Sequence, residues 1–276
     1  MSIRVGISLP VRELGDDLSA IRDFAQAAEA LGLTHLRIPD QVLRDGQLHE
    51  PLTLLSYIAG VTSSIELVPS VIVLPLRQTV LVAKQTATID ALSGGRLRLG
   101  VGVGTNKAEY TAMGIDFHRR GARCDEQLEL LPQLWTGDEI EFEGKFHSVC
   151  GGRINPPAIQ QPIPVWIGAA SVPSDPVVNR IGRFAHGWFV LATPEDFVDV
   201  KSRIDTAAQA HGRNPSDIGT EAGVAVVGPR EHEWRDRVQH WHDTGLTHLC
   251  LRTLGGGIEP GQHVAKMREA VADLPI

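Results

Sequence analysis

The chain has 276 residues, of which 42% are hydrophobic and 21% are charged, and its mean hydropathy is −0.04. This composition excludes an intrinsically disordered chain, because such chains combine low hydrophobicity with high net charge. The net charge of −7 and the pI near 5.9 argue against nucleic-acid binding, which would gather basic residues and raise the pI above about 9.

Short apolar runs alternate with amphipathic stretches of helical length along the whole chain. The runs predict strands over residues 4–9, 35–39, 65–74, 97–103, 164–169, 187–191, 219–227 and 246–252. The stretches between and after them predict helices over residues 17–31, 51–62, 78–92, 120–135, 175–184, 194–211, 231–243 and 259–272. Strands joined by helical crossovers run parallel, so eight such units predict a single α/β domain over residues 1–276, a closed (β/α)8 TIM barrel. An open doubly wound sheet is the alternative.

One irregular region, residues 136–161, separates the fourth and fifth predicted strands. Its two short apolar runs flank Glu143-Gly144, a pattern typical of a small hairpin. We therefore interpret the region as an insertion into the barrel and not as a second domain.

The cysteines and the start of the chain bear on the cellular compartment. Cys124, Cys150 and Cys250 are widely separated and form no C-x-x-C pair, so we expect reduced, mostly buried thiols and no disulfide or zinc framework. The chain enters a strand-like run at once, and no apolar stretch approaches 18 residues. These features lead us to expect a cytoplasmic protein that binds no membrane.

Polar side chains after the second strand are the first candidates for chemistry, because reacting groups of such barrels lie at the carboxyl ends of strands. Asp40 could accept a hydrogen bond from a ligand ring or cap a turn. His49 and Glu50 are possible acid/base groups, although Glu50-Pro51 is also typical of a helix start, which we favour.

Small residues gather at the ends of other strands. Gly100, Gly102 and Gly104 alternate along the fourth strand, but the sequence lacks the Lys-Ser/Thr of a phosphate loop and the third glycine of G-x-G-x-x-G. The glycines either fit crowded barrel packing or let a ligand approach the backbone. Residues 167–171 leave room for a flat ligand, and Gly255 to Gly257 could bind a phosphate on their N–H groups.

Residues 74–104 resemble the signature stretch of the bacterial luciferase-like superfamily, and within it the actinobacterial branch of coenzyme F420-dependent oxidoreductases. Residues 117–123, 134–137, 142–146 and 162–168 extend the similarity. The resemblance is strong over residues 33–191 and weak beyond them.

The resemblance implies a barrel whose carboxyl end holds the ring of F420 or, alternatively, FMN. It implies a non-prolyl cis peptide at Ser70–Val71 behind the ring, and it places Asp40 near the polar edge of the ring. The residues that it implies for the phosphate and side chain of the cofactor are Val103, Gly104, Ala169, Ala170 and Ser171. Because these side chains are small or apolar, we expect backbone N–H groups and the Ser171 hydroxyl to hold the phosphate, with little help from cations.

This chain departs from the sugar-phosphate dehydrogenases of the family. They carry Asp-His where this chain has Asp40-Gln41, and an acidic residue where it has Thr105, so a sugar-phosphate substrate is disfavoured. Gln41 and His49 are then the candidate catalytic residues, with Glu109 as a further polar group to test. His186 precedes the sixth strand, far from the carboxyl ends, and we give it a structural role.

We therefore expect an F420-dependent oxidoreductase that moves a hydride between the cofactor and a small organic substrate. The alternatives are an FMN-dependent two-component monooxygenase, a flavin-free binding or structural paralogue, and a sugar-phosphate barrel that uses the Gly255 loop. No metal site is expected at His232, His240 and His242, because residues two apart on a helix point away from each other. Family members usually dimerise, so we also expect a homodimer.

The resemblance also leads to an expected cofactor preference. We expect F420 to bind at least about tenfold more tightly than FMN. Substitution of Gly104 by valine should weaken cofactor binding, whereas substitution of His240 should not.

Overall fold

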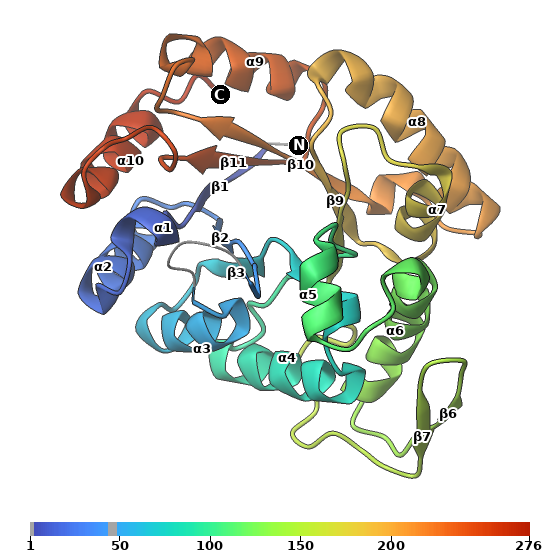
Figure 1. Ribbon diagram of the computed structural model, residues 1–276. Helices are drawn as coiled ribbons and strands as arrows, with labels where there is room; N and C mark the ends of the chain where they lie inside the picture. The colour runs from blue at the N-terminus through green and yellow to red at the C-terminus, as the bar shows by residue number, and fades with distance from the viewer. Residues whose placement is uncertain (1–2, 44–48) are drawn as a thin grey trace.

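The computed structural model describes residues 3–43 and 49–276. Its parallel strands form a barrel surrounded by helices (Figure 1). The strands are, in the order in which they neighbour one another, β3 (Glu66–Pro69), β2 (His35–Ile38), β1 (Arg4–Ser8), β11 (His248–Arg252), β10 (Gly219–Ala225), β9 (Gly187–Val190), β8 (Val165–Gly168), β5 (Leu99–Gly102) and β4 (Ile72–Val73). A parallel bridge between Leu67 and Leu97 joins β3 to the segment before β5 and so closes the barrel. The predicted barrel is confirmed, and the open sheet is not found.

The helices of the outer layer follow the strands as the hydrophobic period predicts. They are α2 (Leu18–Ala30), α3 (Pro51–Val61), α4 (Thr79–Ser93), α6 (Arg120–Trp135), α7 (Asp175–Phe184), α8 (Pro194–Ala210), α9 (Trp234–Asp243) and α10 (His263–Ala272). The first turns predicted for the last two helices are 3-10 turns, Glu231–Glu233 and Pro260–Gln262. Within the described residues, none of the helices combines the length and the apolar character that crossing a membrane requires.

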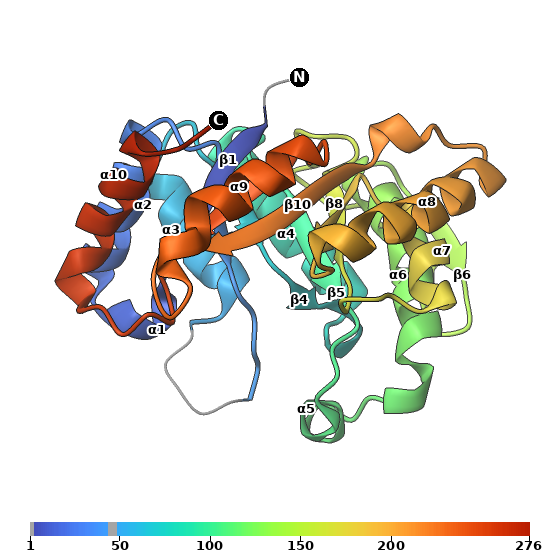
Figure 2. The same ribbon diagram turned by 90° about the horizontal axis from the view of Figure 1, so that it is seen from above.

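Two short helices were not predicted, α1 (Val11–Leu14) and α5 (Lys107–Ala112). Four and six residues are too few to establish a helical period. Both follow the carboxyl end of a strand, and α5 projects beyond the barrel when the molecule is viewed from above (Figure 2).

Helix boundaries agree with local capping chemistry. The Asp17 carboxylate accepts hydrogen bonds from the N–H groups of Ser19 and Ala20 at the start of α2. Glu50 likewise accepts one from Thr53 N at 2.7 Å, with Pro51 in the first turn of α3. The structural interpretation of Glu50-Pro51 is therefore confirmed.

The insertion after α6 forms the predicted hairpin, β6 (Glu141–Glu143) and β7 (Ser148–Cys150), which lies outside the ring of helices (Figure 1). Glu126 of α6 fixes the turn by accepting hydrogen bonds from the N–H groups of Lys145 and Phe146. The cysteines are free: Cys124 and Cys250 are buried as expected, whereas Cys150 on the hairpin is exposed.

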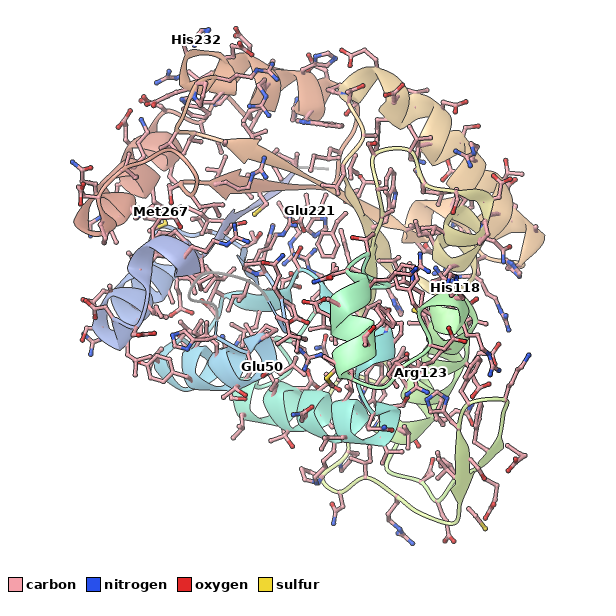
Figure 3. All side chains as sticks on the ribbon, in the orientation of Figure 1. Glu50, His118, Arg123, Glu221, His232 and Met267 are labelled. Carbon is pink, nitrogen blue, oxygen red and sulfur yellow. The ribbon has the colours of Figure 1, made fainter. Side chains whose placement is uncertain are left out.

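The barrel separates an apolar layer from a charged interior. The main hydrophobic core lies between the strands and the outer helices. Glu221 of β10 instead points into the barrel, where it lies near the centre in Figure 3 and is fully buried. It pairs with Arg37 of β2 and with Arg98, the residue before β5. The interior of the barrel therefore contains paired charges, while the layer between the strands and the outer helices is apolar.

Candidate functional site

The strand predicted over residues 65–74 is interrupted at Ser70 and Val71. The peptide bond between them is cis, as the resemblance implies. The interruption separates β3 from β4, and both residues line a cavity at the carboxyl ends of the strands.

The glycines of β5 make room for this bulge. A Cβ on Gly100 would lie 2.0 Å from the Pro69 carbonyl oxygen, and one on Gly102 would lie 2.8 Å from Val71 Cγ2. A Cβ on Gly168, at the end of β8, would lie 2.9 Å from Val71 Cγ1. Real side chains do not approach so closely. Of the two explanations left open by the sequence, crowded barrel packing therefore applies at Gly100 and Gly102.

The cavity beside the bulge has a volume of about 560 Å³. Its walls are mainly apolar and come from β2, the bulge, the ends of β5 and β8, the start of α7 and β9. The polar side chains among its described lining residues belong to Arg37, Ser70, Thr105, Arg120 and Ser174. No carboxylate or imidazole belongs to that described lining. Such a cavity suits a flat, largely apolar ligand that carries an anionic group.

Six of the sequence-predicted cofactor residues line this one cavity. They are Ser70, Val71, Val103, Gly104, Ala169 and Ala170. Ser171 is exposed and is not among the described lining residues, so its predicted contact with a phosphate gains no support.

Arg120 is a cation in the described lining of this cavity, where the sequence led us to expect a phosphate site with little help from cations. It is the first residue of α6 and lines the cavity. Its Nη1 donates to the Phe117 carbonyl oxygen at 2.8 Å, and its guanidinium lies 3.8 Å from the centre of the Phe117 ring. Its Nε is buried without a hydrogen-bond partner among the described residues. Sequence reasoning missed this placement, because no local pattern shows that the first residue of α6 reaches the cavity at the strand ends.

Arg37 forms the inner wall of the cavity. Its Nη1 lies 3.0 Å from Glu221 Oε1, and its Nη2 donates to the Ser70 hydroxyl. The guanidinium also lies 4.7 Å from the centre of the Phe189 ring. Arg37 therefore connects the buried charge of Glu221 to the bulge.

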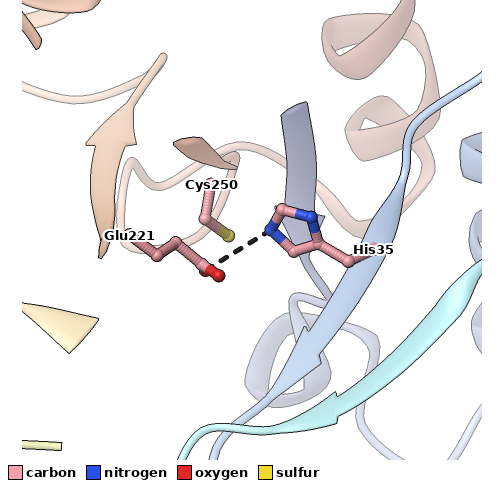
Figure 4. A group of neighbouring side chains, drawn as sticks. All are labelled: His35, Glu221 and Cys250. Carbon is pink, nitrogen blue, oxygen red and sulfur yellow. Dashed lines mark ion pairs between the residues drawn. The ribbon is translucent and has the colours of Figure 1, made fainter. Parts of the chain in front are cut away.

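Glu221 anchors a cluster of charged groups in the barrel floor. Arg98 Nη1 lies 2.6 Å from Glu221 Oε2. His35 Nε2 lies 3.4 Å from Glu221 Oε1 (Figure 4). Burial alone would raise the pKa of Glu221, but the neighbouring His35, Arg98 and Arg37 hold the pKa well below its usual value. His35, Glu221 and Cys250 are close enough to bind a metal ion. We assign none, because the two guanidinium groups already compensate the carboxylate and would repel a cation.

A second cavity of about 200 Å³ adjoins the first, since Arg37 and Ser70 line both. Glu13, on α1, lines the second cavity. Its Oε1 accepts a hydrogen bond from Gly255 N at 2.7 Å, and its Oε2 is buried without a partner among the described residues. Glu13 is an acid/base candidate that the sequence reasoning missed, although its place directly after the first strand is a usable signal.

The same hydrogen bond argues against a phosphate at the Gly255 loop. A carboxylate already accepts the Gly255 N–H group, and it would repel a phosphate there. The sugar-phosphate alternative based on this loop is therefore unsupported.

The groups after the second strand lie apart from the described cavity walls. Asp40 Oδ2 accepts a hydrogen bond from Arg77 Nη2 at 3.0 Å, and its side chain is only 2% exposed. Gln41 accepts one from Arg12 Nη2 at 3.0 Å, and His49 Nε2 lies 4.0 Å from Asp16 Oδ1. A ring contact for Asp40 and catalytic roles for Gln41 and His49 remain untested predictions, and this geometry does not favour them.

Helix α5 joins two loops at the rim of the barrel. The Glu109 carboxylate accepts hydrogen bonds from Val42 N at 3.2 Å and Leu43 N at 3.1 Å. The next residue, Tyr110, donates its hydroxyl to the Val103 carbonyl oxygen, and burial raises the pKa of Tyr110 to about 12. Glu109 therefore positions Val42 and Leu43 after β2, and it does not belong to the described lining of either cavity.

No histidine belongs to the described lining of the cavity beside the bulge. His186 Nδ1 accepts a hydrogen bond from Val165 N at 3.1 Å at the amino end of the sheet, in agreement with the predicted structural role. On and before α9, His232 is largely exposed, and His242 Nδ1 lies 3.5 Å from Oδ1 of its neighbour Asp243.

Comparisons with known proteins agree with this geometry. The family model of the luciferase-like monooxygenases matches residues 3–272. An uncharacterized protein of Mycobacterium tuberculosis is 34% identical over 279 residues, which cover 91% of this chain and 92% of that protein. An F420-dependent glucose-6-phosphate dehydrogenase of Amycolatopsis mediterranei is 27% identical over 243 residues, covering 84% and 71% of the two chains.

A solved structure matches the whole fold. An F420-dependent secondary alcohol dehydrogenase, in complex with an F420-acetone adduct, superposes with a TM-score of 0.84 at 13% identity, covering 100% of both chains. The match of the family model over nearly the whole length confirms the resemblance found in the sequence, and this chain belongs to the luciferase-like monooxygenase family.

Proposed function

We propose that this protein is an F420-dependent oxidoreductase that moves a hydride between the cofactor and a small organic substrate. One observation carries the proposal: the Val71 bulge and the unpaired Arg120 Nε belong to the same apolar cavity. Relatives named for F420 support the choice of cofactor.

The residues present fit such a cofactor. Val71 and Phe189 supply apolar contacts for a flat ring, and Arg120 supplies a cation for the phosphate. The Ser174 hydroxyl makes no capping bond at the start of α7, so it is available to a ligand. When bound, F420 supplies a ring carbon that accepts or releases a hydride, while the cavity orients the reactants and excludes water.

Glu13 is our candidate for the accompanying proton. When a carbinol is oxidised, the carbon loses a hydride to the cofactor and the hydroxyl loses a proton to a base. The buried Glu13 Oε2 has no described partner and belongs to the adjoining cavity. We expect Glu13→Gln to lower turnover without changing the affinity for F420.

Fluorescence titration with both cofactors tests the proposal. We expect F420 to bind at least about tenfold more tightly than FMN, which corresponds to about 1.4 kcal/mol. Arg120→Gln should weaken F420 binding about tenfold. Arg119→Gln is the matched control, because Arg119 packs over Phe146 and does not belong to the described lining of the cavity.

Other results would support the alternatives. Tighter binding of FMN, with consumption of oxygen during turnover, would favour a two-component monooxygenase. Binding of neither cofactor would favour a flavin-free paralogue. Glucose 6-phosphate is not our proposed substrate, because Gln41 and Thr105 stand where the sugar-phosphate enzymes have acid/base groups.

We also propose that the protein is a homodimer whose only other partner is its small-molecule substrate, without nucleic acid or membrane. Light scattering at micromolar concentration tests the assembly. A monomer mass would contradict it.

A further inference from the structure

A cationic cavity lies beside the proposed cofactor site. It has a volume of about 370 Å³ and lies between the loop after β9 and helix α9. Leu191 lines both this cavity and the proposed cofactor cavity. Arg252, the last residue of β11, lines this cavity and also the cavity that contains Glu13. A ligand in the cationic cavity would therefore border both parts of the proposed active site.

Arg252 is a partly buried cation that lacks a counter-charge. No carboxylate of the described residues lies within ion-pair distance of it, and its Nε is buried without a hydrogen-bond partner. A Cβ on Gly223 would lie 3.2 Å from that Nε, so the guanidinium packs against the β10 backbone. Burial lowers the pKa of Arg252, and the charge of Arg37 lowers it further. An unpaired cation in such a place indicates an anionic ligand.

The other charged groups of the cavity strengthen this indication. Arg237 of α9 has no described ion-pair partner, whereas Arg230 is paired with Glu233, at 2.5 Å between Nη2 and Oε2. Glu195 is the acidic residue of the described lining, and it is exposed at the rim. Two arginines therefore remain uncompensated in a chain whose net charge is −7.

We propose that Arg252 and Arg237 form a subsite for an oxyanion of the substrate, either a carboxylate or a phosphate. The binding of an anion here is independent of the proposed function, but the assignment of that anion to the substrate rests on it. A substrate held there by its anionic end would extend past Leu191 toward the ring in the neighbouring cavity. Arginine suits this role because its guanidinium binds carboxylate and phosphate through paired N–H donors.

Calorimetric titration of the cofactor-free protein tests the subsite directly. The probes are inorganic phosphate and acetate, in a background of about 0.15 M sodium chloride, where weak surface attraction is screened. We expect saturable binding of one anion per chain, which Arg252→Met weakens at least tenfold. Arg252→Lys keeps the charge and should retain more affinity than Arg252→Met. Tighter binding of phosphate would identify a phosphate ester as the substrate class, and tighter binding of acetate would identify a carboxylate.

Arg235→Met is the matched control, since Arg235 lies on α9, as Arg237 does, but pairs with Asp273. It should change anion affinity less than twofold. The subsite is overturned if neither probe binds, or if Arg235→Met weakens binding as much as Arg252→Met does. Titration with F420 in parallel separates the two proposals: normal F420 binding without anion binding rejects only the subsite, and the reverse result rejects only the proposed cofactor.

Discussion

Arginines occur both in the barrel floor, which is the cluster around Glu221, and at the mouth, which is the carboxyl end of the strands with its cavities. The two regions differ in whether these arginines have a carboxylate partner. In the floor, Arg37 and Arg98 share the buried carboxylate of Glu221. At the mouth, none of the described carboxylates lies within ion-pair distance of Arg120 or Arg252, which line the neighbouring cavities. Paired charges inside a fold are structural, whereas unpaired ones persist where a ligand supplies the missing partner. The contrast therefore separates the scaffold of this barrel from its binding surface.

The strongest test of the contrast is Glu221→Gln. The change leaves Arg37 without its carboxylate and leaves Arg98 with Glu66 alone, so we expect the free energy of unfolding to fall by about 3 to 5 kcal/mol. Urea denaturation measures the loss. Glu139→Gln is the control, because Glu139 and Arg153 form an exposed pair at 3.9 Å, and it should cost at most about 1 kcal/mol. Equal small losses for both variants would contradict a structural role of the floor cluster.

We also expect low pH to destabilise the fold through a buried histidine, His248, which neighbours the charged groups of the barrel floor. Burial, with the charges of Arg98 and His35, lowers the pKa of His248 to about 3 from 6.5. The neutral form therefore stabilises the fold above about pH 6.5, and this contribution is lost as the pH falls toward about 3. One such proton changes stability by about 1.4 kcal/mol per pH unit.

His248→Asn tests the acid effect by urea denaturation between pH 7 and 4. We expect the pH slope of stability to decrease by about one proton. The exposed His211 provides the control His211→Asn, whose slope should match the unmodified protein. An unchanged slope in the His248 variant would assign the acid sensitivity to other groups.

At the mouth, Ala170→Val should weaken F420 binding about tenfold, or about 1.4 kcal/mol, by crowding the proposed phosphate position. Gly104→Val is a poorer test than the sequence suggests. Gly104 has a φ of 61°, and a Cβ there would lie 2.7 Å from Val73 Cγ1, so the substitution would disturb the fold as well. Gly60→Ala is a suitable control because its Cβ would meet nothing within 4 Å. Unchanged affinity in the Ala170 variant would show that the phosphate does not bind beside Ala170.

The smallest expected effect is a gain in stability, whereas Glu221→Gln in the floor should cause a loss. Arg252→Met removes an uncompensated charge but keeps an apolar stem beside Gly223. The cofactor-free protein should become more stable by about 1 kcal/mol, measured by urea denaturation. A loss of stability comparable to that of Glu221→Gln would show that Arg252 is structural.

Part of the candidate site could be read from the chain. The resemblance over residues 74–104 led to the cis peptide at Ser70–Val71 and to six residues that line one cavity. Sequence reasoning also made Gln41 and His49 candidate catalytic residues, because they are polar and follow the second strand. The structure engages Gln41 with Arg12 instead, and local sequence does not reveal which neighbour a polar side chain meets.

The sequence by itself determined the parallel strands and the longer outer helices of the barrel, because hydrophobic period, caps and glycines act over a few neighbouring residues. Only the tertiary structure decided which charges are paired. Glu221 meets Arg98 across 123 positions of the chain, while Arg120 and Arg252 come to the mouth from α6 and β11 without a carboxylate. Such meetings depend on strand register and helix packing, which bring distant residues together and leave no periodic trace in the sequence.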